Sequence, residues 1–413
     1  MVIKEEKMAI LDRTTFKRGA VSLYIVIFTT LLISIITVSF LRIMLNEQQQ
    51  TVNTDLAQSA YDSALAGAED AKTLLMAYQD CISRGSTDHK CTTIKNSIES
   101  TTCDTLQKVN KNGSGGESGE VVLQVKSGDP NSVDMSQAYT CVTIETDTTD
   151  FVGKLDPGKS KVIPLRFTNP GSVKYIEISW YTQRDNMGSP TVARASVDNM
   201  LFRQSSEWDS AGYPAVLRTQ LIQTASSFTL SEFDSMDSSY QTNRATLFLY
   251  PTNTTDALVK ARDVALSSSK TSGNSPTAAQ CLQTGFGFHA QYACRAVIEL
   301  PKPYGGAARS NTSSFLRLTG FYKSTEFRVV GSSTQNFDSV SNGVIRFDGV
   351  QPSIDSTGRA NNVFRRVISR VEMIDVDFPF PEFAVEMDSD QPFCKAMLIT
   401  DDPSESIAEG DCY

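Results

Sequence analysis

The chain has 413 residues, of which 21% are charged, and its formal net charge at pH 7 is -9. This length allows one large domain or two ordinary ones behind an N-terminal segment. Lys and Arg are not clustered beyond the N-terminus, whereas phosphate binding needs clustered positive charge. Nucleic acid is therefore not an expected partner.

The first predicted element is an apolar helix over residues 20–41. These 22 residues contain no charge, proline or glycine. At about 1.5 Å per residue they span roughly 33 Å, enough to cross the hydrocarbon core of a membrane. A secretory signal peptide has an apolar stretch of only about 7 to 15 residues and a small-x-small cleavage site, which is absent here. The tract is therefore predicted to be a membrane-spanning helix.

The orientation of this helix follows from the charges that precede it. The N-terminal side carries five basic residues: Lys4, Lys7, Arg13, Lys17 and Arg18. Short segments rich in Lys and Arg stay on the cytoplasmic side. We therefore expect a single-pass membrane protein, with residues 1–19 as a cytoplasmic basic leader and the C-terminal part outside.

The helix is expected to continue to about residue 80, as an amphipathic segment after the membrane. One face carries apolar and small residues at spacings of three or four: Val52, Leu56, Ala60, Ala64, Ala68, Ala71 and Leu75. Small residues let neighbouring helices approach closely, although such a face also suits a helix lying on its own domain. A single helix over residues 20–80 would be about 90 Å long.

These residues resemble the N-terminus of type IV pilins and pseudopilins. A basic leader ends at Gly19, and an uncharged apolar helix then continues into a polar, alanine-rich one. The stretch LNEQQQTVNTDLAQSAYDSALAGAEDAK (45–72) is similar to the same segment of PilX-type minor pilins. The resemblance covers about residues 13–75. It implies a protein of the bacterial cell envelope that a prepilin peptidase cleaves between Gly19 and Ala20 and that is methylated at Ala20. It also implies assembly with other pilin subunits and the pilus assembly machinery, ending in an extracellular pilus.

Two residues depart from the pattern of this family. Tyr24 stands where most pilins have a glutamate, which attracts the N-terminal amine of a neighbouring subunit. Leu41 stands where many major pilins have a proline. Both departures argue against a major pilin and for a minor one. The absence of the glutamate also suits the filament tip, where a subunit has no other subunit above it. A membrane anchor that is never cleaved is the alternative.

Eight cysteines follow the helix, and none of them form a CxxC motif. Their even number and local clustering favour disulfides in an oxidising compartment over a zinc site, with buried reduced thiols as the alternative. Sequence does not fix the connectivity, and pairing each cysteine with its neighbour in the sequence is our expectation. The expected pairs are Cys81 with Cys91, Cys103 with Cys141, Cys281 with Cys294, and Cys394 with Cys412.

The rest of the chain is expected to form an α+β protein in which strands dominate. Residues 81–120 form a cysteine-containing loop that ends in a Gly/Ser linker, NGSGGESGE (112–120). Residues 121–413 contain twelve short, partly alternating runs and predict a large antiparallel domain, a sandwich or jelly-roll, with a C-terminus closed by a disulfide. Residues 256–269 are the one helical candidate in this domain.

Catalytic chemistry has few candidates in this sequence. The two histidines, His89 and His289, accompany no GxSxG, HExxH, Walker or Rossmann motif. Acidic clusters at 146–150 and 388–390 have spacings that calcium tolerates, but solvated surface is the preferred interpretation. We expect no catalytic residue, no cofactor and no metal.

The two tryptophans receive different predictions. Trp180 follows an alternating run and is expected in the core, whereas Trp208 lies in the polar stretch QSSEWDSAGYP and is the candidate for an exposed contact. The interpretation of the whole chain is a minor pilin-like subunit that acts in assembly and surface contact, with an unidentified surface ligand. The alternatives are an uncleaved, membrane-anchored adhesin and, less favoured, a tethered envelope hydrolase.

Overall fold

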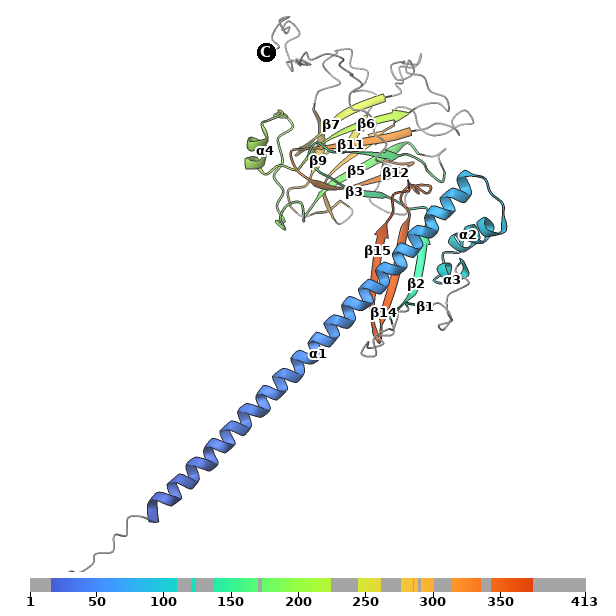
Figure 1. Cartoon of the computed structure of the whole chain (residues 1–413). Coiled ribbons are helices and arrows are strands. Elements are labelled where there is room, and N and C mark those ends of the chain that lie inside the picture. Colours follow the sequence, from blue (N-terminus) through green and yellow to red (C-terminus); the bar gives the residue numbers. More distant parts are fainter. Residues whose placement is uncertain are drawn as a thin grey trace, which may run out of the picture. The chain divides into compact units, whose positions relative to one another are not determined.

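The fold was examined in a computed structural model, shown in Figure 1. The structure describes residues 16–109, 120–123, 137–169, 173–223, 244–260, 276–284, 286–288, 291–300, 314–335 and 343–373. It contains a long apolar N-terminal helix and a large β-rich region, which confirms these two parts of the predicted α+β fold.

Four helices are present in the described residues. Helix α1 spans Phe16–Ser83, 68 residues without interruption, and includes the whole predicted range of 20–80. It has no proline, the residue that most often breaks a helix. The three others are short: α2 His89–Glu99, α3 Thr105–Val109 and α4 Ser205–Ala211. The side chain of Asp88 caps α2 by accepting a hydrogen bond from the backbone N–H of Cys91.

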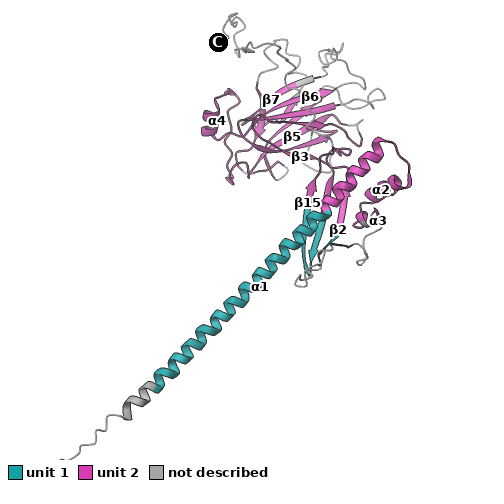
Figure 2. Ribbon diagram, in the orientation of Figure 1, with its two compact units in different colours: residues 1–67, 112–141, 356–367 teal, residues 68–111, 142–355, 368–413 magenta. Residues whose placement is uncertain are grey.

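The chain divides into two compact units, coloured separately in Figure 2. Unit 1 consists of residues 1–67, 112–141 and 356–367, and unit 2 of residues 68–111, 142–355 and 368–413. Helix α1 passes from one unit into the other at Gly67, so the boundary does not follow the ends of helices and strands.

The strands of unit 1 belong to a small four-stranded sheet. Its order is β1-β2-β14-β15, with β1 Val121–Val122, β2 Gln137–Glu145, β14 Ser353–Ala360 and β15 Val363–Arg370. Strand β1 runs antiparallel to β2, with Val121 opposite Tyr139. The guanidinium of Arg359 donates to both carboxylate oxygens of Glu120, at 3.0 and 2.8 Å, which joins β14 to the residue that precedes β1.

Within unit 1, helix α1 and strand β14 are almost in backbone contact. A Cβ atom added to Gly358 would lie 2.1 Å from the carbonyl oxygen of Ala60 and 2.2 Å from the amide nitrogen of Ala64. Ala60, Ser63 and Ala64 are fully buried at this crossing. The alanine face of α1, for which two roles were open, packs here on the chain's own sheet.

Unit 2 is built on an 11-stranded sheet with the order β13-β12-β5-β10-β9-β7-β6-β11-β4, to which β3 is added beside β12 and β8 beside β10. The strands are β3 Phe151–Leu155, β4 Ser160–Pro164, β5 Tyr175–Thr182, β6 Val216–Gln223, β7 Arg244–Thr252, β8 Leu258–Lys260, β9 Pro276–Cys281, β10 Tyr292–Glu299, β11 Ser314–Phe321, β12 Thr325–Ser332 and β13 Val344–Ile345. Most pairs are antiparallel, but β8 with β10 and β7 with β9 are parallel. The sheet is therefore mixed, which corrects the purely antiparallel expectation.

The helix predicted over 256–269 is wrong where the structure can test it. Residues 258–260 form strand β8, which pairs with Val297–Glu299 of β10, and Val259 is buried there. Residues 261–269 lie outside the described part of the chain. Pairing with a strand distant in the sequence outweighed the helical periodicity of this segment.

The core of unit 2 is rich in large side chains. Trp180, Phe327 and Phe347 are each at most 1% exposed, and Trp180 donates its indole N–H to the carbonyl of Ala215 at 2.9 Å. This confirms the prediction that Trp180 lies in the core. These residues come from distant parts of the chain, so the core joins segments that lie far apart in the sequence.

Candidate functional site

The apolar part of α1 is the first candidate site, because its side chains are not covered by the rest of the chain. From Leu23 to Leu45 its large apolar side chains are between 47% and 76% exposed. A helix that is apolar on all sides requires a membrane or other helices around it. Among the described residues, α1 alone is long and apolar enough to cross a membrane, judged by length and composition.

The hydroxyl groups within this segment are satisfied internally. Five hydroxyls donate to the backbone carbonyl four residues earlier, at 2.8–2.9 Å: those of Thr29, Thr30, Ser34, Thr37 and Ser39. Polar groups in hydrocarbon need partners within the protein, because no water is present to replace them. The segment therefore carries its hydroxyls in a form that a membrane tolerates.

The residues predicted from the pilin resemblance all lie on this helix. Gly19 and Ala20 fall near its N-terminal end, since α1 begins at Phe16. Tyr24 is 73% exposed and Leu41 is 51% exposed. The helix continues through Leu41, the position at which many pilins have proline. Nothing in the fold assigns a cleavage or an assembly role to these residues, which remain predictions.

Farther along, within unit 1, α1 has two different sides. Ala60 and Ala64 are buried against β14, whereas Tyr61 and Leu65 are 43% and 38% exposed. Residues four apart lie on the same face of a helix, so Tyr61 and Leu65 form an exposed apolar pair. One side of the helix is thus fixed to the sheet, and another is exposed.

The disulfides agree with the sequence where the structure describes them. Cys81 at the end of α1 is bonded to Cys91 of α2, and Cys281 of β9 is bonded to Cys294 of β10, its direct neighbour in the sheet. Both are expected pairs. Cys103 and Cys141 are also disulfide-bonded. The remaining two, Cys394 and Cys412, lie outside the described residues.

The acidic cluster at 146–150 is not the solvated surface that was expected. The Asp150 side chain is only 13% exposed and accepts hydrogen bonds from Arg328 at 2.7 Å and from Arg370 at 2.8 Å. Two guanidinium groups neutralise this carboxylate and leave it unsuited to calcium. Residues 388–390 lie outside the described part of the chain, whose His, Cys, Asp and Glu residues form no group of three or more that could hold a metal.

The two histidines do not form a site in the described residues. His89 is the first residue of α2 and is exposed. His289 lies outside the described part of the chain. The sequence predicts that neither histidine is catalytic, and this stays a prediction.

Trp208 is not an exposed contact, and that prediction is wrong. It is 0% exposed on α4, stacks on Tyr322 with ring centroids 4.3 Å apart, and donates its indole N–H to the carbonyl of Pro214 at 3.0 Å. Tyr213 and Tyr250 contact its ring edge-to-face, each at 5.2 Å. Two of these partners are distant in the sequence, so the polar neighbours of Trp208 concealed its burial.

No protein-family model, no curated protein and no solved structure matches this chain.

Proposed function

We propose that this chain is a minor pilin-like structural subunit of a bacterial type IV pilus or a related filament, located at the tip and acting in assembly and surface contact. One observation carries the proposal. Helix α1 is a single helix whose apolar part, Leu23–Leu45, is uncovered and whose next part is fixed to a small sheet by alanine and glycine.

This arrangement suits a subunit that exchanges a membrane for a filament. The uncovered apolar segment can lie in lipid before assembly and between the helices of other subunits afterwards, because both environments exclude water. The backbone contact at Gly358 holds the helix to its sheet without long side chains that could shift. Movement of the helix would therefore be passed directly to the sheet of unit 1.

In this proposal the N-terminus is cytoplasmic and the β-rich part lies outside the membrane. The five basic residues before Ala20 support the first statement. The disulfides Cys81–Cys91 and Cys281–Cys294 support the second, since disulfides persist in oxidising compartments. The partners would be the membrane, a prepilin peptidase, other pilin subunits and the assembly machinery.

The position at the tip rests on Tyr24. A neutral phenol cannot attract the N-terminal amine of the next subunit as a carboxylate does. A subunit with nothing above it does not need that attraction. The proposed role is structural and assigns no catalysis to the chain.

Processing of the N-terminus tests the proposal. The full chain, produced with a prepilin peptidase in a bacterial membrane, should yield a mature protein that begins at Ala20 and carries one added methyl group, measured by intact-protein mass spectrometry. Gly19→Leu should block cleavage, because a bulky side chain is placed at the scissile bond. Ala20→Ser, which keeps a small residue beside that bond, should still be cleaved.

An intact chain beginning at Met1, in cells where the peptidase processes its own pilin, would contradict the proposal and favour an uncleaved, membrane-anchored adhesin. Labelling of assembled filaments supplies the second readout. We expect label at filament ends only, and label along the whole shaft would contradict the tip position.

A further inference from the structure

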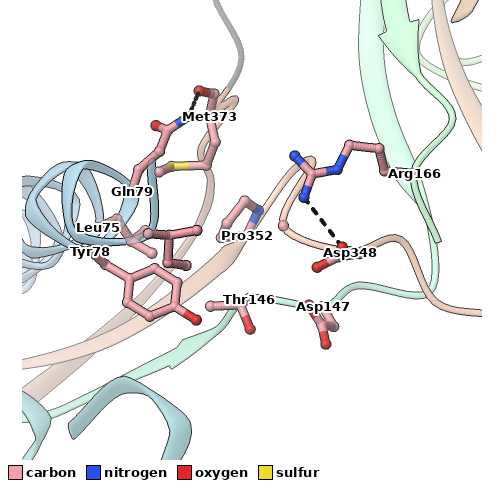
Figure 3. Close-up of a pocket in the computed structure, with 11 residues that line it drawn as sticks. Leu75, Tyr78, Gln79, Thr146, Asp147, Arg166, Asp348, Pro352 and Met373 are labelled. Carbon is pink, nitrogen blue, oxygen red and sulfur yellow. Dashed lines mark hydrogen bonds and ion pairs between the residues drawn. The ribbon is translucent and has the colours of Figure 1, made fainter. Parts of the chain in front are cut away.

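Unit 2 contains a cleft that takes no part in the proposed filament function. Its volume is about 550 Å³ counting the open mouth, and Figure 3 shows the residues around it. The apolar wall consists of Leu75 and Ile82 from α1 together with Pro352 and Met373. Gln79 donates its amide N–H to the carbonyl of Met373 at 3.0 Å, which joins two sides of the wall.

The polar side of the cleft has an excess of negative charge. Asp147, Asp348 and Arg166 line it, and the guanidinium of Arg166 pairs with Asp348 at 3.2 Å. Arg346 also lies near Asp147 but is paired with Glu145. Burial, and then the charge of Asp348, raise the pKa of Asp147, despite hydrogen bonds from the backbone N–H of Gly349 and the side chain of Thr146 and despite the charge of Arg346. One carboxylate in the cleft therefore lacks a cation of its own.

Tyr78 adds an aromatic ring and an oxygen to the same space. Its hydroxyl points toward the side that carries Thr146 and Asp147, as Figure 3 shows, and it makes no hydrogen bond within the described residues. Burial is the main cause that raises the pKa of Tyr78, followed by the negative charges of Glu99, Asp147 and Asp348. The phenol thus lies in a negative field with its oxygen still available.

We propose that this cleft binds a lysine side chain of another protein chain. Its apolar wall matches the four-carbon stem of lysine, which packs on apolar surface while the charged end reaches polar groups. The ammonium group has three donors, and the cleft offers three acceptors in Asp147, Asp348 and the hydroxyl of Tyr78. The ring of Tyr78 also attracts a cation placed over its face.

Lysine fits this chemistry better than arginine. Arginine prefers a single carboxylate that it can bind through two parallel hydrogen bonds, but Asp348 is already paired with Arg166, and Asp147 already accepts hydrogen bonds from Gly349 and Thr146. A compact ammonium needs no such plane and can be shared between separate oxygens. Its charge also offsets the repulsion by Asp348, which is the second cause, after burial, that raises the pKa of Asp147.

The test is a ligand-observed NMR titration that measures binding of Nα-acetyl-lysine methylamide, whose side-chain amine is free, to the full chain in an uncharged detergent. The matched ligand is N-acetyl-norleucine methylamide, which keeps the apolar stem and lacks the ammonium. We expect the lysine probe to bind and the norleucine probe to bind at least about tenfold more weakly, because the norleucine probe cannot donate charged hydrogen bonds to the carboxylates.

Variants locate the binding in the cleft. Asp147→Asn should weaken binding of the lysine probe about tenfold, whereas Asp198→Asn, which removes an exposed carboxylate elsewhere in unit 2, should leave it unchanged. Tyr78→Phe should weaken binding less, since the ring remains. Circular dichroism of each variant checks that it is folded.

Three outcomes would overturn the inference: no binding of the lysine probe, equal binding of the norleucine probe, or equal weakening by Asp147→Asn and Asp198→Asn. If Asp147→Asn fails to fold, Tyr78→Phe and the comparison of the two probes decide the question alone.

Discussion

The two units of this chain fill their interiors in opposite ways. In unit 1, helix α1 meets strand β14 through Ala60, Ala64 and Gly358, so that two backbones are separated by almost no side-chain atoms. In unit 2, the interior is filled by large rings such as Trp180 and Trp208, whose indole N–H groups donate to backbone carbonyls.

The difference implies opposite sensitivities to mutation. A contact between backbones has no room for an additional carbon, so it fails when atoms are added. A core of large rings fails when atoms are removed, because a cavity remains.

Removal of the Trp208 ring should be the most damaging change. Trp208→Ala leaves a cavity among Tyr213, Tyr250 and Tyr322 and should lower the free energy of unfolding of unit 2 by about 3–5 kcal/mol. Trp208→Phe keeps a ring and loses the hydrogen bond to Pro214, so it should cost less. Denaturant unfolding followed by fluorescence measures both. A loss below about 1 kcal/mol for Trp208→Ala would contradict the buried role and revive the exposed one.

In unit 1, the addition of one carbon atom should be enough to destabilise the packing of the helix on the sheet. Gly358→Ala places a Cβ against the backbone of Ala60 and Ala64, which cannot turn away as a side chain can, and should cost about 1–3 kcal/mol. Hydrogen–deuterium exchange should show faster exchange of the α1 amides around residue 60.

Gly287→Ala is the matched control in unit 2. The nearest atom to its added Cβ is the end of the flexible Leu282 side chain, at 3.0 Å. Its effect on the melting temperature should be small. Equal effects of the two substitutions would contradict the contrast between backbone contact and side-chain contact.

The smallest predicted effect concerns the pH dependence of unit 2. The pKa of Asp147 is raised in the folded chain. Between the unfolded-state pKa of about 3.9 and this raised pKa, the folded state therefore binds more protons than the unfolded state. Stability falls as the pH rises through this window. Asp147→Asn removes that loss and should raise the melting temperature at pH 7 by no more than about 2 °C.

At a pH of about 3 the advantage of Asp147→Asn should disappear, because the carboxyl is protonated in both states. Thermal unfolding at the two pH values measures the difference, with Asp198→Asn as the exposed control. An advantage that is larger at low pH would show that the sign of the effect is wrong.

Sequence alone predicted the elements whose causes are local. The range 20–80 contains no proline, has an uncharged tract and repeats alanine every three or four residues, and the structure has one helix over Phe16–Ser83. Cys81 and Cys91 lie close in the sequence and form one disulfide. Most strands of unit 2 also coincide with alternating apolar runs, because a pleated strand repeats every two residues.

Strand β14 was not predicted, for a reason visible in its residues. Its sequence, SIDSTGRA, has small residues at the buried positions Ser356, Gly358 and Ala360. Apolar alternation identifies strands that pack on large side chains, whereas this strand is approached by the backbone of a helix. Its glycine, Gly358, is the point of closest contact with that helix.

The long helix, its apolar segment, the β-rich region and the short-range disulfides could be predicted from the sequence, because each depends on neighbours along the chain. The burial of Trp208, the contact between Gly358 and α1, and the cleft lined by Leu75, Asp147 and Met373 are visible only in the folded chain. These facts depend on residues brought together from distant segments, and no local pattern records which distant residue a side chain will meet.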